Sequence, residues 1–308
     1  MHKYIFKRLL MMIPIMLGVT FIIFFISYIT PGDPAQLILG EAAPLESIAA
    51  LREEMGLDDP FLVRYVNFVI NAVQGDLGQS FITRRGVFEE IMDRFPTTLQ
   101  LAIYGTILSI LIGIPLGIIS ATKQYSIFDN VATSIGLLGV SIPNFWLGLM
   151  LILLFSVNLG WLPVSGIDTP SGWVLPIITI GTGSAAMVMR ITRSSMLEVV
   201  RQDYIRTARA KGQTETVIIR RHALRNALIP VVTAVGLDFG FLLGGAVLTE
   251  SIYALNGVGR FIVDAIARRD FPIMQGGVLI LAIAFSFVNL FVDILYAYID
   301  PRIKSQYS

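Results

Sequence analysis

The chain contains no cysteine and only two histidines, His2 and His222, among 308 residues. The lack of thiols excludes disulfides, thiolate metal sites and thiol chemistry, and two distant histidines are too few for a histidine-rich metal site. Charged residues are also scarce, at 15%, whereas a soluble domain usually carries about 25%. With 55% hydrophobic residues and a mean hydropathy of +0.72, the composition predicts an all-α integral membrane protein.

Six long apolar runs account for this hydropathy. They cover residues 9–29, 97–122, 131–157, 173–189, 228–252 and 272–292. A helix needs roughly 20 apolar residues to cross about 30 Å of hydrocarbon, so we expect six transmembrane helices. The first run is longer than the apolar region of a signal peptide and continues into a proline-containing turn, which predicts an uncleaved helix.

The distribution of Lys and Arg predicts the orientation. The N-terminus, the loop at Lys123, the loop at 190–227 and the C-terminal tail carry 15 of the 23 basic residues, so both termini and these loops are expected in the cytoplasm. The segment 30–96 is then a large external insertion with eleven acidic residues and five arginines. It predicts a helix at 45–55, and a second helix after Asp59 and Pro60 that lies at the outer membrane surface. No internal repeat is present, so residues 1–308 are read as a single membrane domain.

The segment 190–227, which we expect in the cytoplasm, differs from an ordinary basic loop because it contains residues that typically begin and end helices. From Ser195 the apolar spacing predicts a helix whose last turn contains Lys211 and which Gly212 ends as a left-handed cap. Thr214 can begin a second short helix that leads into the fifth span. The small residues Thr207, Ala208 and Ala210 allow close docking to a partner, whereas the arginines alone would suit anionic lipid headgroups.

This segment resembles the cytoplasmic coupling loop of ABC-importer permeases, whose general pattern is Glu-Ala-Ala, three residues, Gly. Here Arg206 and Thr207 stand where that pattern has Glu and its first Ala, and Gly212 matches the glycine. The strings YIRTARAKG and RHALRNALIPVV are similar to the permeases of the dipeptide, oligopeptide and nickel ABC importers. Other segments resemble the same branch in the same order, with one departure at Asn256, where proline is expected; they include PGDPA, MGLDDPFLVRYVNF, GDLGQSF, RFPTTLQLA, GVSIPNFWLGLMLILLF and LTESIYALNGVGRFIVDAIARRDFPIMQG.

The resemblance implies the type I ABC-importer permease fold, in a bacterial or archaeal plasma membrane. Its expected partners are a second homologous permease, two cytoplasmic ATPase subunits, an extracytoplasmic substrate-binding protein and membrane lipid, without nucleic acid. The expected substrate is a dipeptide or oligopeptide; relatives of this branch also carry nickel chelates, glutathione or sugars. The expected ATPase-coupling residues are Tyr204, Arg206, Thr207, Ala208, Ala210, Lys211 and Gly212.

The chain has no G-x-x-x-x-G-K-[ST] phosphate loop, so we expect no catalytic residue and no bound cofactor, with ATP and Mg²⁺ held by the ATPase partners. Three polar residues within spans are candidates for the translocation path: Asp238, Asn144 and Asn289. A carboxylate at the centre of a span costs on the order of 3 kcal/mol, so Asp238 should face the pore, a polar group or a partner.

Two other classes of protein can be weighed against the importer. An intramembrane aspartyl protease needs two membrane carboxylates, for which Asp238 and Asp293 could be proposed. However, Asp238 stands in Gly-Leu-Asp-Phe-Gly rather than Gly-x-Gly-Asp, and Asp293 lies near the cytoplasmic edge. A stand-alone secondary transporter would leave the coupling segment unexplained, and such proteins often show repeated halves.

Overall fold

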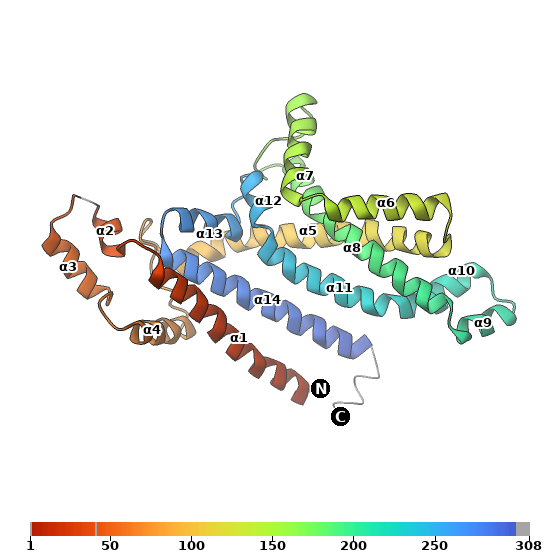
Figure 1. The fold of residues 1–308 in the computed structure, drawn as a ribbon, viewed down its shortest axis with the longest axis horizontal. Coiled ribbons are helices and arrows are strands. Elements are labelled where there is room, and N and C mark those ends of the chain that lie inside the picture. The colour runs from red at the N-terminus through yellow and green to blue at the C-terminus, as the bar shows by residue number, and fades with distance from the viewer. Residues whose placement is uncertain (1, 41, 300–308) are drawn as a thin grey trace.

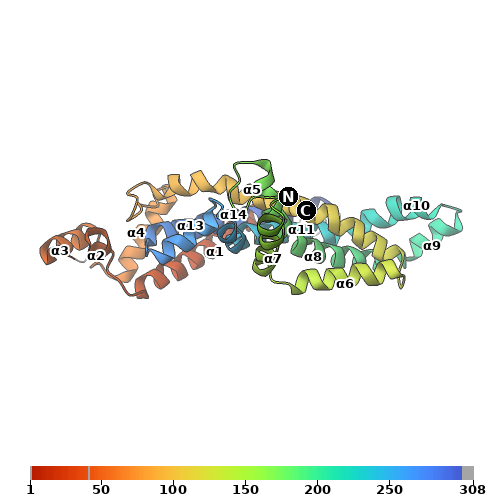
Figure 2. The ribbon, with the colours of Figure 1, turned by 90° about the horizontal axis from the view of Figure 1, so that it is seen from above.

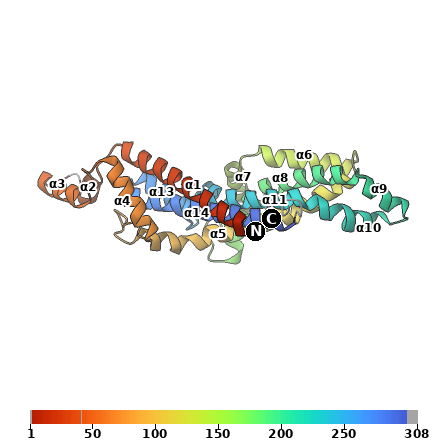
Figure 3. The same cartoon turned by 90° about the horizontal axis from the view of Figure 1, so that it is seen from below.

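The computed structural model describes residues 2–40 and 42–299, and these are helical with no strand beyond one isolated bridge between Gln79 and Gly86. The molecule is elongated. The helices of the 30–96 insertion lie at one end and α9 (Asp203–Ala210) and α10 (Glu215–Val217) at the other (Figures 1, 2 and 3). The expected all-helical fold is confirmed for this part of the chain, whereas Arg302 and Lys304 of the basic tail lie outside the described residues.

Five helices of the described chain are long and apolar enough to cross a membrane. They lie within α1 (His2–Ile29), α5 (Val87–Thr122), η2 (Pro170–Trp173) with α8 (Val174–Val200), α10 with α11 (Leu224–Gly245), and α14 (Phe271–Ile299). A sixth span is present only if a bent pair of helices is counted as one. The apolar runs therefore locate the spans well, but the number six depends on the third run.

The third run, 131–157, is not one straight helix as we expected. It consists of α6 (Ile127–Ser141), α7 (Asn144–Leu151) and a π-helical continuation η1 (Ile152–Asn158), with a bend of 100° between α6 and the α7–η1 unit. Pro143 is the cause, because a residue before proline is pushed out of the helical region and Ile142 accordingly has ψ 122°. Figure 1 shows α7 rising away from the bundle beyond this bend.

Helices α5 and α8 form the closest pair in the bundle. A Cβ added to Gly113 of α5 would lie 2.7 Å from the carbonyl oxygen of Ala185 on α8, and one added to Gly117 would lie 2.5 Å from Cβ of Thr192. Only glycine permits this approach. In lipid, close backbone contact of this kind is a main source of helix association.

Helix α5 begins ten residues before the apolar run that starts at residue 97. Its first turns carry Val87 and Ile91, both fully buried against α13 (Val258–Ala267) and α14. The carboxylate of Glu250, in α12 (Val247–Ile252), is also fully buried; it accepts from Thr98 Oγ1 at 2.6 Å and from the backbone N–H of Arg260 at 2.9 Å. These two bonds connect α13 to α5 through Glu250 near the N-terminal end of α5.

The external insertion contains α2 (Pro34–Leu39), α3 (Leu45–Glu54) and α4 (Phe61–Val73). Helix α3 ends near Gly56 as expected, but α4 begins one residue later than predicted, because Pro60 rather than Asp59 is its N-cap residue. Helix α4 packs back along α1 through aromatic rings, with Phe61 and Tyr65 against Phe21 and Phe24. At 13 residues it is too short to cross the hydrocarbon, in keeping with a helix at the outer surface.

Candidate functional site

The segment between α8 and α11 forms a helical hairpin at the tip of the molecule. Helix α8 ends at Val200, Gln202 adopts an extended conformation, and α9 starts at Asp203. The single helix expected from Ser195 onward is therefore two helices. The hairpin returns through α10 and the π-helical turn η3 (Ile218–Ala223) into α11, and it projects beyond the other helices (Figure 1).

Gly212 makes the turn of the hairpin, as expected. Its φ of +77° lies in the left-handed region, which side-chain-bearing residues enter only at a cost. Its N–H donates to the carbonyl of Arg209 at 2.9 Å, and the N–H of Gln213 donates to that of Ala208 at 3.3 Å. The last carbonyls of α9 are therefore satisfied within the turn. Thr214 precedes α10 as expected, although its side chain makes no capping hydrogen bond.

The inner face of α9 is bound to the rest of the chain. Ile205 is fully buried, Ala208 is only 9% exposed, and both join a small core beneath the hairpin. The other buried members of this core are Ala121, Met196, Ile218, Ala223 and Ala227. The hairpin is thus seated on the ends of α5, α8 and α11 and moves with them.

Polar contacts brace the same unit. Arg209 forms a bidentate pair with Glu215 across the turn, with Nε–Oε1 2.7 Å and Nη2–Oε2 3.3 Å, and these bonds raise the pKa of Arg209 above its ordinary value. Asn226 Nδ2 donates to the Tyr204 hydroxyl at 2.8 Å. Ser195 Oγ donates to the carbonyl of Ala227 at 2.8 Å, which joins α8 to α11.

The outer face of the hairpin is open to solvent. Of the seven residues expected to contact a partner, six are exposed and one, Ala208, is buried by its own chain. Thr207 bonds back to the Asp203 carbonyl at 3.0 Å, and Arg206 lies 3.6 Å from the Asp203 carboxylate. The six exposed residues comprise two basic, three small and one aromatic residue: Tyr204, Arg206, Thr207, Ala210, Lys211 and Gly212.

A second brace near the hairpin was missed from the sequence. Arg193 of α8 donates to Asp129 through Nε at 2.8 Å and Nη2 at 2.9 Å, and also to Ser120 Oγ at 2.9 Å. Asp129 is 3% exposed and further accepts from the Tyr125 backbone N–H. It ties the turn between α5 and α6 to α8. The only sequence signal was Ser126 three residues before Asp129 at the start of α6, since the basic partner lies 64 residues away.

The three polar candidates within the spans do not gather into one site. The Asp238 carboxyl lies beside Ser184 of α8, and its Oδ2 is buried with no hydrogen-bond partner among the described residues. Asn144 approaches the adjacent residue of α8, because its Oδ1 lies 3.0 Å from where a Cβ of Gly183 would be. Asn289 instead lines a cavity of about 340 Å³ between α1, α11 and α14.

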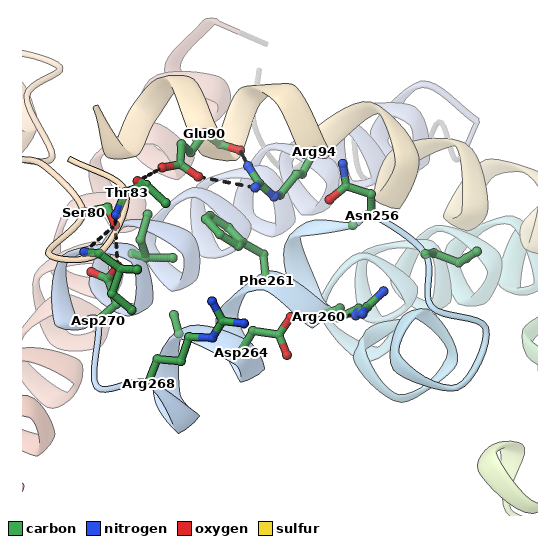
Figure 4. A pocket seen from close by; sticks show the side chains of 15 residues that line it. Ser80, Thr83, Glu90, Arg94, Asn256, Arg260, Phe261, Asp264, Arg268 and Asp270 are labelled. Carbon is green, nitrogen blue, oxygen red and sulfur yellow. Dashed lines mark hydrogen bonds and ion pairs between the residues drawn. The ribbon is translucent and has the colours of Figure 1, made fainter. Parts of the chain in front are cut away.

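At the opposite end, a polar cleft of about 270 Å³ lies between the start of α5, the loop before it and α13. Figure 4 shows Arg94 in this cleft, paired with Glu90 at 3.3 Å and stacked over the ring of Phe261 at 3.7 Å. On the other wall Asp270 accepts from Ser80 (Figure 4). Asp270 also accepts from the backbone N–H of Phe81, and Glu90 accepts from Thr83. These contacts join the loop before α5 to the segment after α13, while Arg94 joins α5 to α13 through Phe261.

The fold and the hairpin define a class of protein: a multi-span helical membrane protein with a braced, solvent-exposed helical hairpin at one end. Family comparison gives the particular assignment. The model for the binding-protein-dependent transport system inner membrane component matches residues 113–305, and the model for the N-terminal part of such membrane components matches residues 1–102. The chain belongs to this family of ABC-importer permeases, which are multi-pass inner-membrane subunits and not the ATPases themselves.

Individual relatives agree with this assignment over the whole chain. The dipeptide transport system permease protein DppB of Alkalihalophilus pseudofirmus is 47% identical and covers 99% of this chain and 100% of its own. The glutathione transport system permease protein GsiC is 44% identical in Salmonella choleraesuis and 43% in Escherichia coli, with 99% of both chains covered. The MetNI methionine ABC transporter shares the fold, with a TM-score of 0.60 at 20% identity over 68% of this chain and 96% of its own. The resemblance expected from the sequence motifs is confirmed.

Proposed function

We propose that this permease forms an import pore together with a second homologous permease, two cytoplasmic ATPase subunits and an extracytoplasmic binding protein. The observation that carries the proposal is the hairpin of α9 and α10. It is held to α5, α8 and α11 by a buried core and braced by hydrogen bonds, yet its outer face is exposed and carries small residues beside Arg206 and Lys211. The exposed face of the hairpin can transmit a force to α5, α8 and α11 only when a partner protein binds to it.

In this mechanism ATP and Mg²⁺ bind to the partner ATPases. When these subunits close, they displace the hairpin as a rigid body, and α8 and α11 carry the displacement into the membrane. The spans then alternate between an inward-open and an outward-open arrangement. The contact residues are Tyr204, Arg206, Thr207, Ala210, Lys211 and Gly212, with Ala208 supporting the surface from beneath.

The arrangement we propose in the membrane has six spans with both termini in the cytoplasm, α6 and α7 contributing one bent span. The distribution of basic residues supports this orientation. The chain has no cysteine, which makes the test direct. Single cysteines placed at Thr214 and at Leu45 should react with an impermeant thiol reagent from opposite sides of the membrane; reaction of both from the same side would contradict the topology.

The exposed apolar surface of α7 and η1 supports the proposal that a second permease binds to this chain. Phe145, Trp146, Leu149, Leu153 and Val157 all have large exposed fractions on a unit that stands away from the bundle. Asp238 and Asn144, both close to α8, are the residues we propose to line the translocation path between the two permeases. Asn289 lines a separate cavity between α1, α11 and α14, so its position supports a place in the translocation path less well.

The substrate we propose is a dipeptide or short oligopeptide, since a dipeptide permease is 47% identical over the whole chain. The tripeptide glutathione is the second candidate, because glutathione permeases reach 44%. Uptake of labelled dipeptide and labelled glutathione by cells that carry the complete transporter separates the two. Competition of one substrate by the other would place both in the same pore.

The proposal as a whole is tested by co-purification. The chain is tagged, extracted from its native cells in mild detergent, and the bound proteins are identified by mass spectrometry. A second permease and ATPases of the nucleotide-binding type should accompany it. A lone or homo-oligomeric chain that retains transport would overturn the proposal.

A further inference from the structure

A polar cavity of about 330 Å³ lies at the outer end of α1, on the far side of the molecule from the hairpin. It is lined by residues of the last turn of α1, the turn that follows, α3 and the start of α4. Figure 1 shows where these elements lie in the fold. Its walls carry three side-chain hydroxyls and two guanidinium groups around one carboxylate. The lining polar residues are Ser27, Tyr28, Thr30, Asp33, Arg52 and Arg64.

The two arginines of the cavity differ in what they bind. Arg52 is neutralised by two carboxylates, with Nη1–Asp33 Oδ2 2.5 Å and Nη2–Asp58 Oδ1 2.6 Å. Within residues 2–40 and 42–299, Arg64 has no carboxylate at salt-bridge distance. Its guanidinium donates to the carbonyl of Leu57 at 3.3 Å and lies about 6 Å from the ring centroid of Tyr28.

Arg64 is also partly removed from water. Burial lowers the pKa of its guanidinium, in contrast to Arg52, whose pKa the carboxylates raise. A guanidinium stays charged at neutral pH even so. Asp58, Asp59 and Arg52 act on Arg64 only at longer range, without a salt bridge. A half-buried guanidinium without a direct carboxylate partner gains from an anionic oxygen, and its planar fork suits the two oxygens of a phosphate.

A third guanidinium lies beside the same turn. A Cβ built on Gly32, which lines the cavity, would be 2.6 Å from Nη1 of Arg269, so this side chain packs directly over the glycine. Arg269 likewise has no salt-bridge partner among the described residues. The external insertion is acidic as a whole, yet at this point two cations without carboxylate partners approach one turn.

The surface that leads into the cavity is apolar. On α1 the side chains of Ile22, Ile26 and Ile29 are 58%, 48% and 59% exposed and follow one another at helical spacing up to the cavity. On α4, Leu62 and Val66 are likewise exposed beside it. The ligand that matches both features is an amphiphile with an anionic head and a hydrocarbon tail.

We propose that this cavity binds the phosphate of an anionic phospholipid of the outer leaflet, with Arg64 as the principal ligand and an acyl chain along the Ile22–Ile29 face of α1. The leaflet rests on the orientation proposed above, whereas the binding itself does not. The lipid fills the groove between α1 and the insertion and holds α4 at the membrane surface.

The test uses the assembled transporter in mild detergent. Native mass spectrometry counts phosphatidylglycerol and phosphatidylcholine retained by the wild-type protein, by Arg64→Gln and by Arg84→Gln. Arg84 is an exposed arginine of the same insertion, so its substitution changes the net charge equally without touching the cavity. Loss of a charge-assisted bond to phosphate should weaken phosphatidylglycerol binding about tenfold in Arg64→Gln, with Arg84→Gln unchanged.

Two further arms keep the test decisive. Arg64→Lys retains the charge and should restore part of the binding, and Arg269→Gln should weaken it without disturbing the packing of α4 on α1. Equal retention of the two lipids by the wild type, or equal loss in Arg64→Gln and Arg84→Gln, would overturn the proposal. So would displacement of the lipid by glycerol phosphate at equal concentration, because the site would then be one for a soluble anion. Peptide uptake is measured separately, so failure of the importer assignment is distinguishable from failure of the lipid site.

Discussion

Two alanines of the hairpin, Ala208 and Ala210, provide the sharpest test of how the coupling surface is built. From the sequence they are equivalent small residues, but Ala208 is buried by its own chain and Ala210 is exposed. Substitution of each alanine by leucine adds the same side-chain volume, but the two positions are two residues apart and lie on opposite faces of the helix. The two variants should therefore fail in different ways.

Ala208→Leu forces three extra carbons into the core formed with Ile205 and Met196. Overpacking of this kind costs about 1–3 kcal/mol. In a chain of this size that lowers the thermal midpoint by a few degrees, on the order of 2–4 °C per kcal/mol. Ala210→Leu buries nothing in the free chain, so its stability should stay within about 0.5 kcal/mol of the wild type.

The second measurement is ATPase association. Ala210→Leu should reduce the ATPase recovered with the tagged chain about tenfold, because the added side chain holds the partner away from the surface. Thermal unfolding in detergent and the ATPase ratio on co-purification report the two effects separately. A destabilised Ala210→Leu beside an unperturbed Ala208→Leu would show that the assignment of inner and outer faces is wrong.

Three other substitutions test other parts of the structure. Gly212→Pro cannot adopt a φ of +77° and loses the bond to the Arg209 carbonyl, so the protein should insert but no longer retain its ATPases; normal peptide uptake would contradict the coupling role. Arg193→Gln leaves the Asp129 carboxylate buried without its cation and should cost about 3–5 kcal/mol in thermal unfolding assays, whereas a stable variant would show that the pair carries no stability. Asp238→Asn should alter peptide uptake while the complex still assembles, and unchanged uptake would assign the carboxylate a structural role.

Much of the architecture was readable from the sequence because hydropathy dominates a membrane fold. The apolar runs located five spans, and Gly212 and Gly56 were correctly identified as helix ends from their flanking residues. The outward extension of α5 was not readable. Val87 and Ile91 lie in a polar-looking stretch, and their burial depends on α13 and α14 almost two hundred residues later in the chain.

The errors have local physical causes. The chain has neither glycine nor proline at the break between α8 and α9, which falls at Gln202. The helical spacing of apolar residues therefore predicted one continuous helix across it. Pro143 indicated a bend in the third apolar run. We nevertheless predicted one straight helix there because the apolar run is long enough to span the membrane. The apolar spacing that predicted the helix included Ala208, but it could not show that residues of α5, α8, η3 and α11 cover this side chain, so we expected it at the partner surface.

The close packing of α5 on α8 has a mechanical consequence. Because Gly113 and Gly117 leave no side chain between the two backbones, the helices tilt together. Helix α5 has 36 residues and reaches from the Ser120–Asp129–Arg193 brace to the Glu90–Arg94 cleft. At about 1.5 Å per residue it is about 54 Å long, so a tilt of about 5° about one end would move the other end by about 5 Å. That distance is close to the spacing of about 4.8 Å between neighbouring extended peptide strands. In the mechanism proposed above, a small tilt at the hairpin end of α5 would therefore become a displacement of about one strand spacing at its other end.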